Sequence, residues 1–166
     1  LLESRGLGDV YKRQGLWFFN SGPLAGASQP HRHIQLLRRD PSELSCPREK
    51  WILDFDNVNY KSQRFYKNII LKKFSKTLNK ENIYEIYKDL SYKLGLGKPE
   101  IDKKPRYPYN LIFTNHWMLL IKRKTDNLFG LSVNALGFAG YILVTEKSDI
   151  KYLKEIGPEK LLENFL

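Results

Sequence analysis

Apolar residues alternate with polar ones, or form short runs, in several stretches of the first half of the chain, and this spacing predicts β-strands. Residues 16–20 are expected to form a strand that enters a turn of small residues. Residues 30–37 are expected to form the next strand, which ends at the turn-forming residues 40–42. An imperfect alternation over residues 65–74 favours a third strand over a helix.

A hairpin is predicted further along the chain, where two apolar and aromatic runs follow one another closely. The runs cover residues 111–114 and 117–121, and the residues Asn115 and His116 between them suit a tight connection. One more strand is expected at about residues 140–144.

The middle of the chain shows the helical period instead. Apolar residues recur three and four positions apart, with Asn79 as a candidate N-cap and Gly95 just past the end. The residues of this predicted buried face are Ile83, Ile86, Tyr87, Leu90 and Leu94. Residues 98–108 contain three prolines and mixed charges, which predicts a loop.

Two short helices are expected near the C-terminus. Ser148 and Asp149 are candidate caps for a helix that runs to about residue 156. Pro158 suits the first turn of another helix after Gly157. The strands and helices together indicate an α+β domain.

Composition limits the classes of protein to which the chain can belong. Its 166 residues have the length of one domain, and no apolar run approaches the roughly 20 residues that cross a bilayer. The single cysteine, Cys46, provides no disulfide framework, so we expect a cytoplasmic protein that has no membrane partner. The net charge of +10 suits a polyphosphate ligand or a nucleic acid, but the lysines of residues 61–93 are spread out, as on a solvated surface.

The segment from Gly26 to Gln35 carries the strongest chemical signal. On an extended strand His31, His33 and Gln35 would share one face, because side chains two residues apart point the same way, while Ile34 would face the other. A neutral imidazole is a good nucleophile toward phosphorus. The small residues before the histidines would let backbone N–H groups approach phosphate oxygens.

Other interpretations of the two histidines stay open at this point. They could be structural residues of a strand, or they could form a metal-binding pair. A metal site lacks a good third ligand, because Cys46 lies in a polar, proline-flanked stretch and Gln35 is a poor zinc ligand. His116 lies beside Trp117 in the predicted turn, outside this array, and a structural role is expected for it.

Three ordered motifs resemble those of one enzyme family. Residues 20–35 resemble the active-site stretch of the histidine-triad superfamily, in the transferase branch, where glutamine replaces the third histidine. Residues 108–118 and 132–141 are similar to the C-terminal part of the ATP adenylyltransferases, also called diadenosine tetraphosphate phosphorylases. The resemblance extends from about residue 15 to residue 166.

This resemblance implies a fold and an activity. It implies a histidine-triad-like antiparallel sheet with flanking helices, incomplete at the N-terminus, and phosphorolysis of diadenosine tetraphosphate to ADP and ATP through an adenylyl-histidine. His33 would be the nucleophile, His31 would orient it or assist the leaving group, and Gln35 would bond a phosphate oxygen. The residues assigned to phosphate or nucleotide binding are Asn20, Gly26, Ala27, Ser28, Gln29, Asn134, Ala135, Leu136 and Tyr141.

The same resemblance implies the partners of the full-length protein. These are diadenosine tetraphosphate, ATP, ADP and inorganic phosphate, with Mg²⁺ held mostly through the substrate phosphates rather than by a protein metal site, and no organic cofactor is expected. Two alternatives remain. One is a sister hexose-1-phosphate nucleotidyltransferase that uses the same His33 chemistry, and the other is a non-catalytic nucleic-acid-binding module that uses the basic surface.

The first residues of the chain have a different origin. Residues 4–14 match the in-frame translation of a transposase adapter used in sequencing libraries. We therefore expect residues 1–14 to be adapter-derived rather than native, and we leave them out of the fold prediction. Residues 15–166 are then expected to be the C-terminal portion of a longer nucleotidyltransferase domain.

Overall fold

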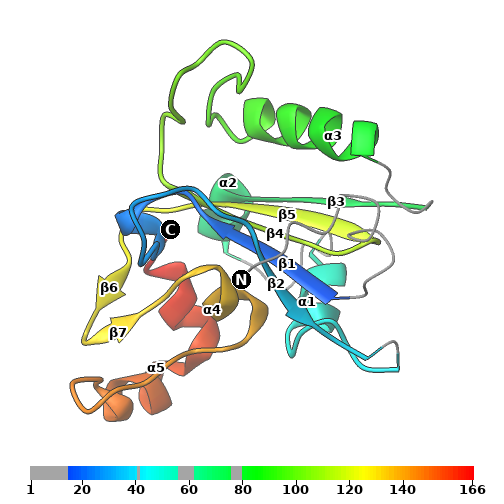
Figure 1. Ribbon diagram of the computed structural model, residues 1–166. Coiled ribbons are helices and arrows are strands. Elements are labelled where there is room, and N and C mark those ends of the chain that lie inside the picture. The colour runs from blue at the N-terminus through cyan, green and yellow to red at the C-terminus, as the bar shows by residue number, and fades with distance from the viewer. Residues whose placement is uncertain (1–14, 41, 56–61, 76–79) are drawn as a thin grey trace, which may run out of the picture.

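The computed structural model describes residues 15–40, 42–55, 62–75 and 80–166 (Figure 1). The adapter interpretation of residues 1–14 and the predicted helix cap at Asn79 lie outside the described residues.

One five-stranded antiparallel sheet forms the centre of the protein. Its order is β2-β1-β4-β5-β3, so the two strands of the predicted hairpin lie side by side in the middle. The strands are β1 (Gly15–Asn20), β2 (Gln35–Arg38), β3 (Ile69–Lys73), β4 (Tyr109–Phe113) and β5 (Trp117–Lys122). A separate two-stranded hairpin consists of β6 (Asn127–Leu128) and β7 (Leu131–Ser132). The mixed fold and the central hairpin confirm the sequence predictions.

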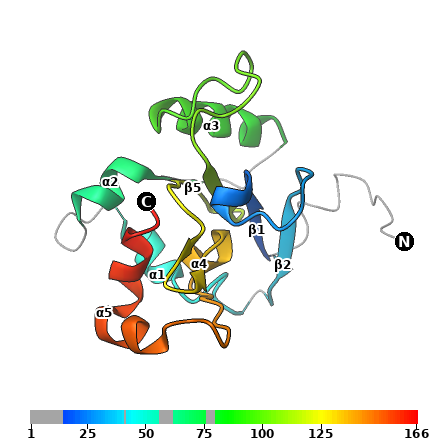
Figure 2. The same ribbon diagram turned by 90° about the vertical axis from the view of Figure 1, so that its left-hand side faces the viewer.

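Both faces of the sheet are covered by helices (Figures 1 and 2). One face packs against α3 (Lys80–Lys93), and the opposite face packs against α5 (Ile150–Glu163) and three shorter helices. The three are α1 (Glu49–Leu53), α2 (Gln63–Asn68) and α4 (Ala135–Ala139). We call the two sides of the sheet the α3 face and the α5 face.

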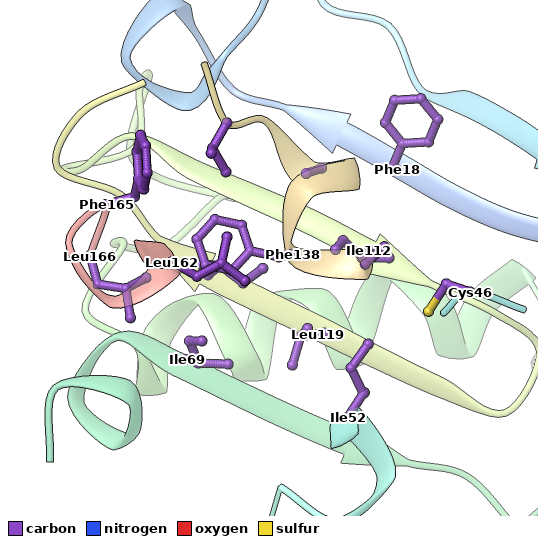
Figure 3. Close-up of a cluster of buried hydrophobic side chains, with 14 of the residues drawn as sticks. Phe18, Cys46, Ile52, Ile69, Ile112, Leu119, Phe138, Leu162, Phe165 and Leu166 are labelled. Carbon is purple, nitrogen blue, oxygen red and sulfur yellow. The ribbon is translucent and has the colours of Figure 1, made fainter. Parts of the chain in front are cut away.

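The central strands β4 and β5 are mostly apolar because both of their faces are buried. In β5, Leu119 and Ile121 point to the α5 face, whereas Met118 and Leu120 point to the α3 face. On the α5 face, Phe138 of α4 and Leu162 of α5 pack over the sheet (Figure 3).

The predicted helix in the middle of the chain is confirmed as α3. Leu90 and Leu94 are buried against the α3 face of the sheet, as the helical spacing predicted. Gly95, at φ 75°, adopts the left-handed conformation just past the helix end. Residues 98–108 form the expected loop.

The two predicted C-terminal helices lie end to end in α5. The Asp149 carboxylate accepts a hydrogen bond from the Tyr152 N–H over 2.8 Å and so caps the first helix. Gly157 has non-helical dihedral angles, φ 76° and ψ 161°, and Pro158 opens the next turn. The cap and the break both confirm the sequence analysis.

Three strand predictions need correction. The strand expected at residues 30–37 begins only at Gln35, and Pro30, which has no N–H to donate, lies in the irregular segment before it. Residues 65–74 divide into α2 and β3, because the Ser62 side chain caps a helical turn around the buried Phe65.

The third correction concerns residues 140–144. Gly140 ends α4 at φ 111°, and only one isolated bridge, Ser132 to Leu143, follows in the described residues. Leu143 and Val144 are exposed, so an apolar run marks an uncovered surface here rather than a buried strand.

Candidate active site

Two histidines lie together at the end of the loop that follows β1. The ring centroids of His31 and His33 are 4.9 Å apart and the rings are tilted by 46°. The sequence analysis expected the two side chains to share a face, and their rings do meet, although on irregular backbone before β2. His31 is exposed and His33 is half-buried.

The His33 ring has a defined hydrogen bond. Its Nδ1 lies 3.1 Å from the backbone oxygen of His31. A carbonyl oxygen only accepts, so Nδ1 carries the proton in this bond. The neutral ring then has its lone pair on Nε2, and Nε2 is the atom that is free to act as a nucleophile.

Gln35 is the first residue of β2. It pairs with Phe18 in the register of β1 and β2, so its side chain points to the same face of the sheet as Phe18. Phe18 belongs to the buried cluster on the α5 face. Gln35 therefore faces the side of the sheet on which α4 lies.

A short 3-10 helix, η2 (Pro23–Ala25), shapes the loop between β1 and the histidines. The N–H groups of Gly26 and Ala27 donate within the loop, to the Pro23 and Gly22 oxygens over 2.8 and 3.0 Å. Gly26 has φ 80°, and a Cβ placed on it would lie 2.7 Å from the Cβ of Asn134. Glycine is thus required here both by the backbone conformation and by the close approach of Asn134.

Ser28 and Gln29 extend from the tightened loop toward the histidines. Both side chains are exposed, and within the described residues their backbone N–H groups have no hydrogen-bond partner. Of the loop amides that the sequence analysis assigned to phosphate oxygens, those of Ser28 and Gln29 are available to a ligand. Gly26 and Ala27 use theirs to hold the loop.

Asn134 is the N-cap of α4 and lies beside this loop. Its Oδ1 accepts from the Leu136 N–H over 2.9 Å and from the Gly137 N–H over 3.4 Å. In the part of the chain that the structure describes, its Nδ2 has no partner, so this group can donate to a ligand. Ala135 donates its backbone N–H to Asn20 Oδ1 over 2.9 Å. The structure therefore brings the predicted residues Asn20, Gly26, Asn134 and Ala135 together.

The sequence analysis assigned no role to two polar residues beneath this group. Asn110 of β4 donates from Nδ2 to Asn20 Oδ1 over 2.7 Å and to the Ala25 oxygen over 2.8 Å. Arg123 donates from Nη1 to Asn110 Oδ1, and from Nη2 to the backbone oxygens of Thr125 and Val133, each over 2.7 Å.

Both residues are buried, at 0% and 3% exposure. The available signal was the presence of an asparagine and an arginine at the ends of apolar strands. Polar residues in such positions need partners.

The environment of Arg123 explains why it can stay charged there. Burial lowers the pKa of Arg123 to about 10, and Asp126 acts in the opposite direction. At neutral pH the guanidinium is therefore a cation. It is enclosed by carbonyl oxygens and lies 5.0 Å from the centroid of the Phe138 ring.

The remaining predicted residues have other contacts. The Tyr141 ring lies beside Arg39, with the guanidinium carbon 5.4 Å from its centroid, rather than in the Asn20 group, and its hydroxyl is buried without a partner in the described residues. His116 occupies the turn between β4 and β5, where its backbone oxygen accepts from the Phe74 N–H over 2.8 Å.

Cys46 lies in the buried cluster of the α5 face (Figure 3). Burial raises its pKa to about 11, which makes it a poor metal ligand at neutral pH. Within the described ranges, no three histidine, cysteine or carboxylate side chains gather in a way that could hold a metal ion. No helix in those ranges is long and apolar enough to span a membrane.

Comparison with known families decides the relationship. The ATP adenylyltransferase C-terminal domain matches residues 51–165, which is more than half of the chain. The chain belongs to the ATP adenylyltransferase, or Ap4A phosphorylase, family. The Ap4A phosphorylase N-terminal domain of the same family matches residues 9–52, the region that carries the histidine pair.

Individual proteins of this family give the same result. Diadenosine 5',5'''-P1,P4-tetraphosphate phosphorylase 2 of Saccharomyces cerevisiae is 24% identical over 89% of this chain and 50% of its own length. The crystal structure of yeast Ap4A phosphorylase Apa2 superposes with a TM-score of 0.56 at 19% identity, over 95% of this chain and 55% of that one.

The structure of the same enzyme in complex with AMP gives a TM-score of 0.58 at 20% identity, over 91% and 53% of the two chains. The complex with Ap4A gives 0.55 at 17% identity, over 98% and 56%. These likenesses show the fold. The chain spans about half the length of the relatives that it matches.

Proposed function

We propose that the full-length protein that contains this segment converts diadenosine tetraphosphate and inorganic phosphate into ADP and ATP. His33 Nε2 attacks an α-phosphorus, the bond from that phosphorus to the bridging oxygen breaks, and ATP leaves. Inorganic phosphate then attacks the adenylyl group on His33, the phosphorus–nitrogen bond breaks, and ADP leaves. In the reverse direction the enzyme joins ADP and ATP into diadenosine tetraphosphate and releases inorganic phosphate.

The hydrogen bond from His33 Nδ1 to the His31 oxygen carries this proposal. It leaves the Nε2 lone pair free without the need for a general base, and it holds the ring in one orientation. A covalent intermediate divides one displacement between two anions into two easier steps, which predicts ping-pong kinetics. His31, whose ring contacts His33, is proposed to orient the nucleophile or to assist the leaving group.

The loop beside His33 supplies the phosphate contacts in this proposal. The donors to phosphate oxygens are the N–H groups of Ser28 and Gln29 and the Nδ2 of Asn134, which have no partner among the described residues. Donors that are fixed before the reaction stabilise the charge that develops at phosphorus. Gly26 and Asn20 hold this loop against α4.

Gln35 is proposed to favour transfer over hydrolysis. An amide can bond a phosphate oxygen, but it cannot take a proton from water as imidazole can. The adenylyl-histidine is then protected until phosphate arrives. Mg²⁺, held through the substrate phosphates, would neutralise part of their charge.

The substrates follow from the same proposal. We infer that the partners are diadenosine tetraphosphate, ATP, ADP and inorganic phosphate. Among the relatives, yeast Apa2 has been crystallised with Ap4A and with AMP, which supports a nucleotide ligand. A cytoplasmic location is proposed because the chain has a single cysteine, the buried Cys46, and disulfides are rare in that compartment.

Covalent labelling tests the proposal. The full-length protein is incubated without phosphate in diadenosine tetraphosphate labelled at its α-phosphates, and an acid-labile, base-stable label on the protein is expected. His33→Asn should abolish this label. His116→Asn is the matched control, because His116 lies in the turn between β4 and β5, and it should keep the label. A label that persists in His33→Asn would refute the proposed nucleophile.

The alternative activity, that of a sister hexose-1-phosphate nucleotidyltransferase, shares this first step. The two activities differ in the substrate that accepts the adenylyl group. The labelled protein is offered inorganic phosphate or a hexose 1-phosphate in turn. Release of labelled ADP supports phosphorolysis, whereas release of a nucleotide sugar alone would support the sister activity.

A further inference from the structure

A cavity lies on the α3 face of the sheet, opposite the face on which Asn20 and Asn110 meet. It has a volume of about 80 Å³ and is lined by α3, by residues 98–99 and 102–105, by the sheet residues Phe19 and Tyr109, and by Ser21 and Arg32 of the segment between β1 and β2 that carries His31 and His33. Phe19 and Tyr109 point to the α3 face, whereas their neighbours Asn20 and Asn110 meet on the α5 face. Figures 1 and 2 show α3 and the loop after it standing over the sheet on the side opposite α4.

The cavity offers two hydroxyl protons to a ligand, one from Ser91 and one from the pair of Tyr87 and Tyr109. Ser91 is 1% exposed and lines the cavity, and its Oγ has no hydrogen-bond partner among the described residues. The hydroxyls of Tyr87 and Tyr109 are 2.7 Å apart, so one donates to the other and the second keeps a free proton. Burial raises the pKa of Tyr109, as does Tyr87, so its hydroxyl stays protonated at neutral pH. A buried donor without an acceptor is costly unless a ligand completes it.

The charges at the cavity favour an anion. Arg32, Lys103 and Lys104 line it, and Arg32 is close enough to Tyr109 to oppose the rise in its pKa. The one carboxylate in the lining, that of Asp102, already accepts from the Lys98 N–H over 2.6 Å and lies 3.9 Å from Arg106. The lining therefore contains four cations, Arg32, Lys98, Lys103 and Lys104, and one carboxylate.

The size of the cavity limits the ligand. A volume of about 80 Å³ holds a few water molecules or one tetrahedral oxyanion, but not a nucleoside. We propose that this cavity binds an oxyanion of phosphate chemistry, either free inorganic phosphate or the terminal phosphoryl group of a nucleotide. Ser91 and the tyrosine pair would donate to its oxygens, and Lys103, Lys104 and Arg32 would balance its charge.

The test is a titration with inorganic phosphate at constant ionic strength, followed through the backbone amide resonances of the ¹⁵N-labelled chain. Saturable shifts are expected at Ser91 and at residues 103–104. The double variant Lys103→Gln/Lys104→Gln should weaken this response by at least about fivefold. The matched control Lys151→Gln/Lys154→Gln removes two exposed lysines of α5 and should leave it unchanged. Equal weakening in both variants, or no saturable shift, would overturn the inference.

Ser91→Ala separates ligand binding from folding. Because the Ser91 hydroxyl has no partner within the described residues, its removal should not lower the thermal midpoint of the free protein, and alanine favours the helix. The affinity for phosphate should nevertheless fall severalfold. An unchanged affinity would remove Ser91 from the site and contradict the proposal.

The same spectra identify the source of the oxyanion and keep this inference apart from the proposed function. A response at Ser91 to inorganic phosphate assigns the free ion, and a response to ATP alone assigns a nucleotide phosphoryl group. Ser28 and Gln29 report on the candidate active site. If Ser28 and Gln29 respond and Ser91 does not, only the oxyanion site on the α3 face is overturned. If Ser91 responds and Ser28 and Gln29 do not, only the phosphate contacts proposed beside His33 are overturned.

Discussion

Asn110 donates a hydrogen bond to Asn20 over 2.7 Å, and this bond joins the start of β4 to the end of β1 beside the candidate active site. Asn20 in turn accepts from the first residue of α4, and Arg123 donates to Asn110 from below. The loop that carries the histidines therefore rests on a buried polar network. Each member of the network supplies a partner that another member needs.

Replacing Asn110 with alanine should destabilise the protein by about 3 kcal/mol. The change leaves Nη1 of Arg123 and the Ala25 oxygen without the partner that Asn110 supplies, and an unpaired buried polar atom costs more than the bond itself contributes. Urea unfolding measures the free energy. Asn68→Ala is the control, because Asn68 makes one exposed bond to the Arg64 oxygen, and its cost should stay within about 0.5 kcal/mol. Equal costs for the two variants would mean that the network does not stabilise the fold.

Gly26→Ala should lower the free energy of unfolding by about 2 kcal/mol or more and should also reduce the proposed adenylyl transfer. The residue has φ 80°, and the new methyl group would meet Asn134, so the loop would have to move. Gly22→Ala serves as the matched control in the same loop, because Gly22 has extended backbone and nothing lies within 4 Å of a Cβ there. Thermal unfolding and labelling of His33 are the measurements. The expectation is wrong if both variants behave alike.

The stability of the protein should fall at alkaline pH in a way that depends on Cys46. Burial raises the pKa of its thiol to about 11 from an ordinary value of 9.0. The unfolded chain therefore loses this proton first, so the contribution is complete below about pH 9 and is lost as pH rises through about 11.

The expected loss from Cys46 is about 2 to 3 kcal/mol across this range. Unfolding free energies at several pH values between 8 and 11 should decline less steeply in Cys46→Ala than in the unchanged protein. Tyr109 titrates in both proteins, so its contribution cancels in the comparison. Parallel curves would show that the thiol is not the group responsible.

Gln35→His should raise the share of AMP among the products of the full-length enzyme. An imidazole at this position could activate water against the proposed adenylyl-histidine, whereas the first step of the proposed reaction would survive. The ratio of AMP to ADP at a fixed phosphate concentration is the readout. Gln63→His, on the exposed surface of α2, provides the control and should leave the ratio unchanged. A normal rate with an unchanged ratio in Gln35→His would show that Gln35 does not select the acceptor.

The elements that depend on local interactions could be read from the sequence. The helical period that ends at Leu94, the cap at Asp149 and the break at Gly157 all confirmed their predictions. The hairpin of β4 and β5 did so too. In each case the signal and the bonds that it predicts lie within a few residues of each other.

Other features were decided only by contacts between distant parts of the chain. β2 begins at Gln35 because that residue reaches Phe18 of β1, and residues 140–144 form no strand because only a single bridge reaches them. Neither limit is visible in the apolar pattern, since an apolar run has the same form whether or not a partner strand lies beside it.

The candidate active site also has features that the sequence predicted and features that only the tertiary structure decided. The sequence by itself determined the chemical groups, since the histidine pair, the following glutamine and the small-residue loop are a contiguous segment. The tertiary structure decided how they are supported. Asn20 is separated from Asn110 by 90 residues and from Ala135 by 115, so no local periodicity records that they meet. Such polar pairs form where the packed strands leave donors and acceptors without water, and that happens only once the sheet is closed on both faces.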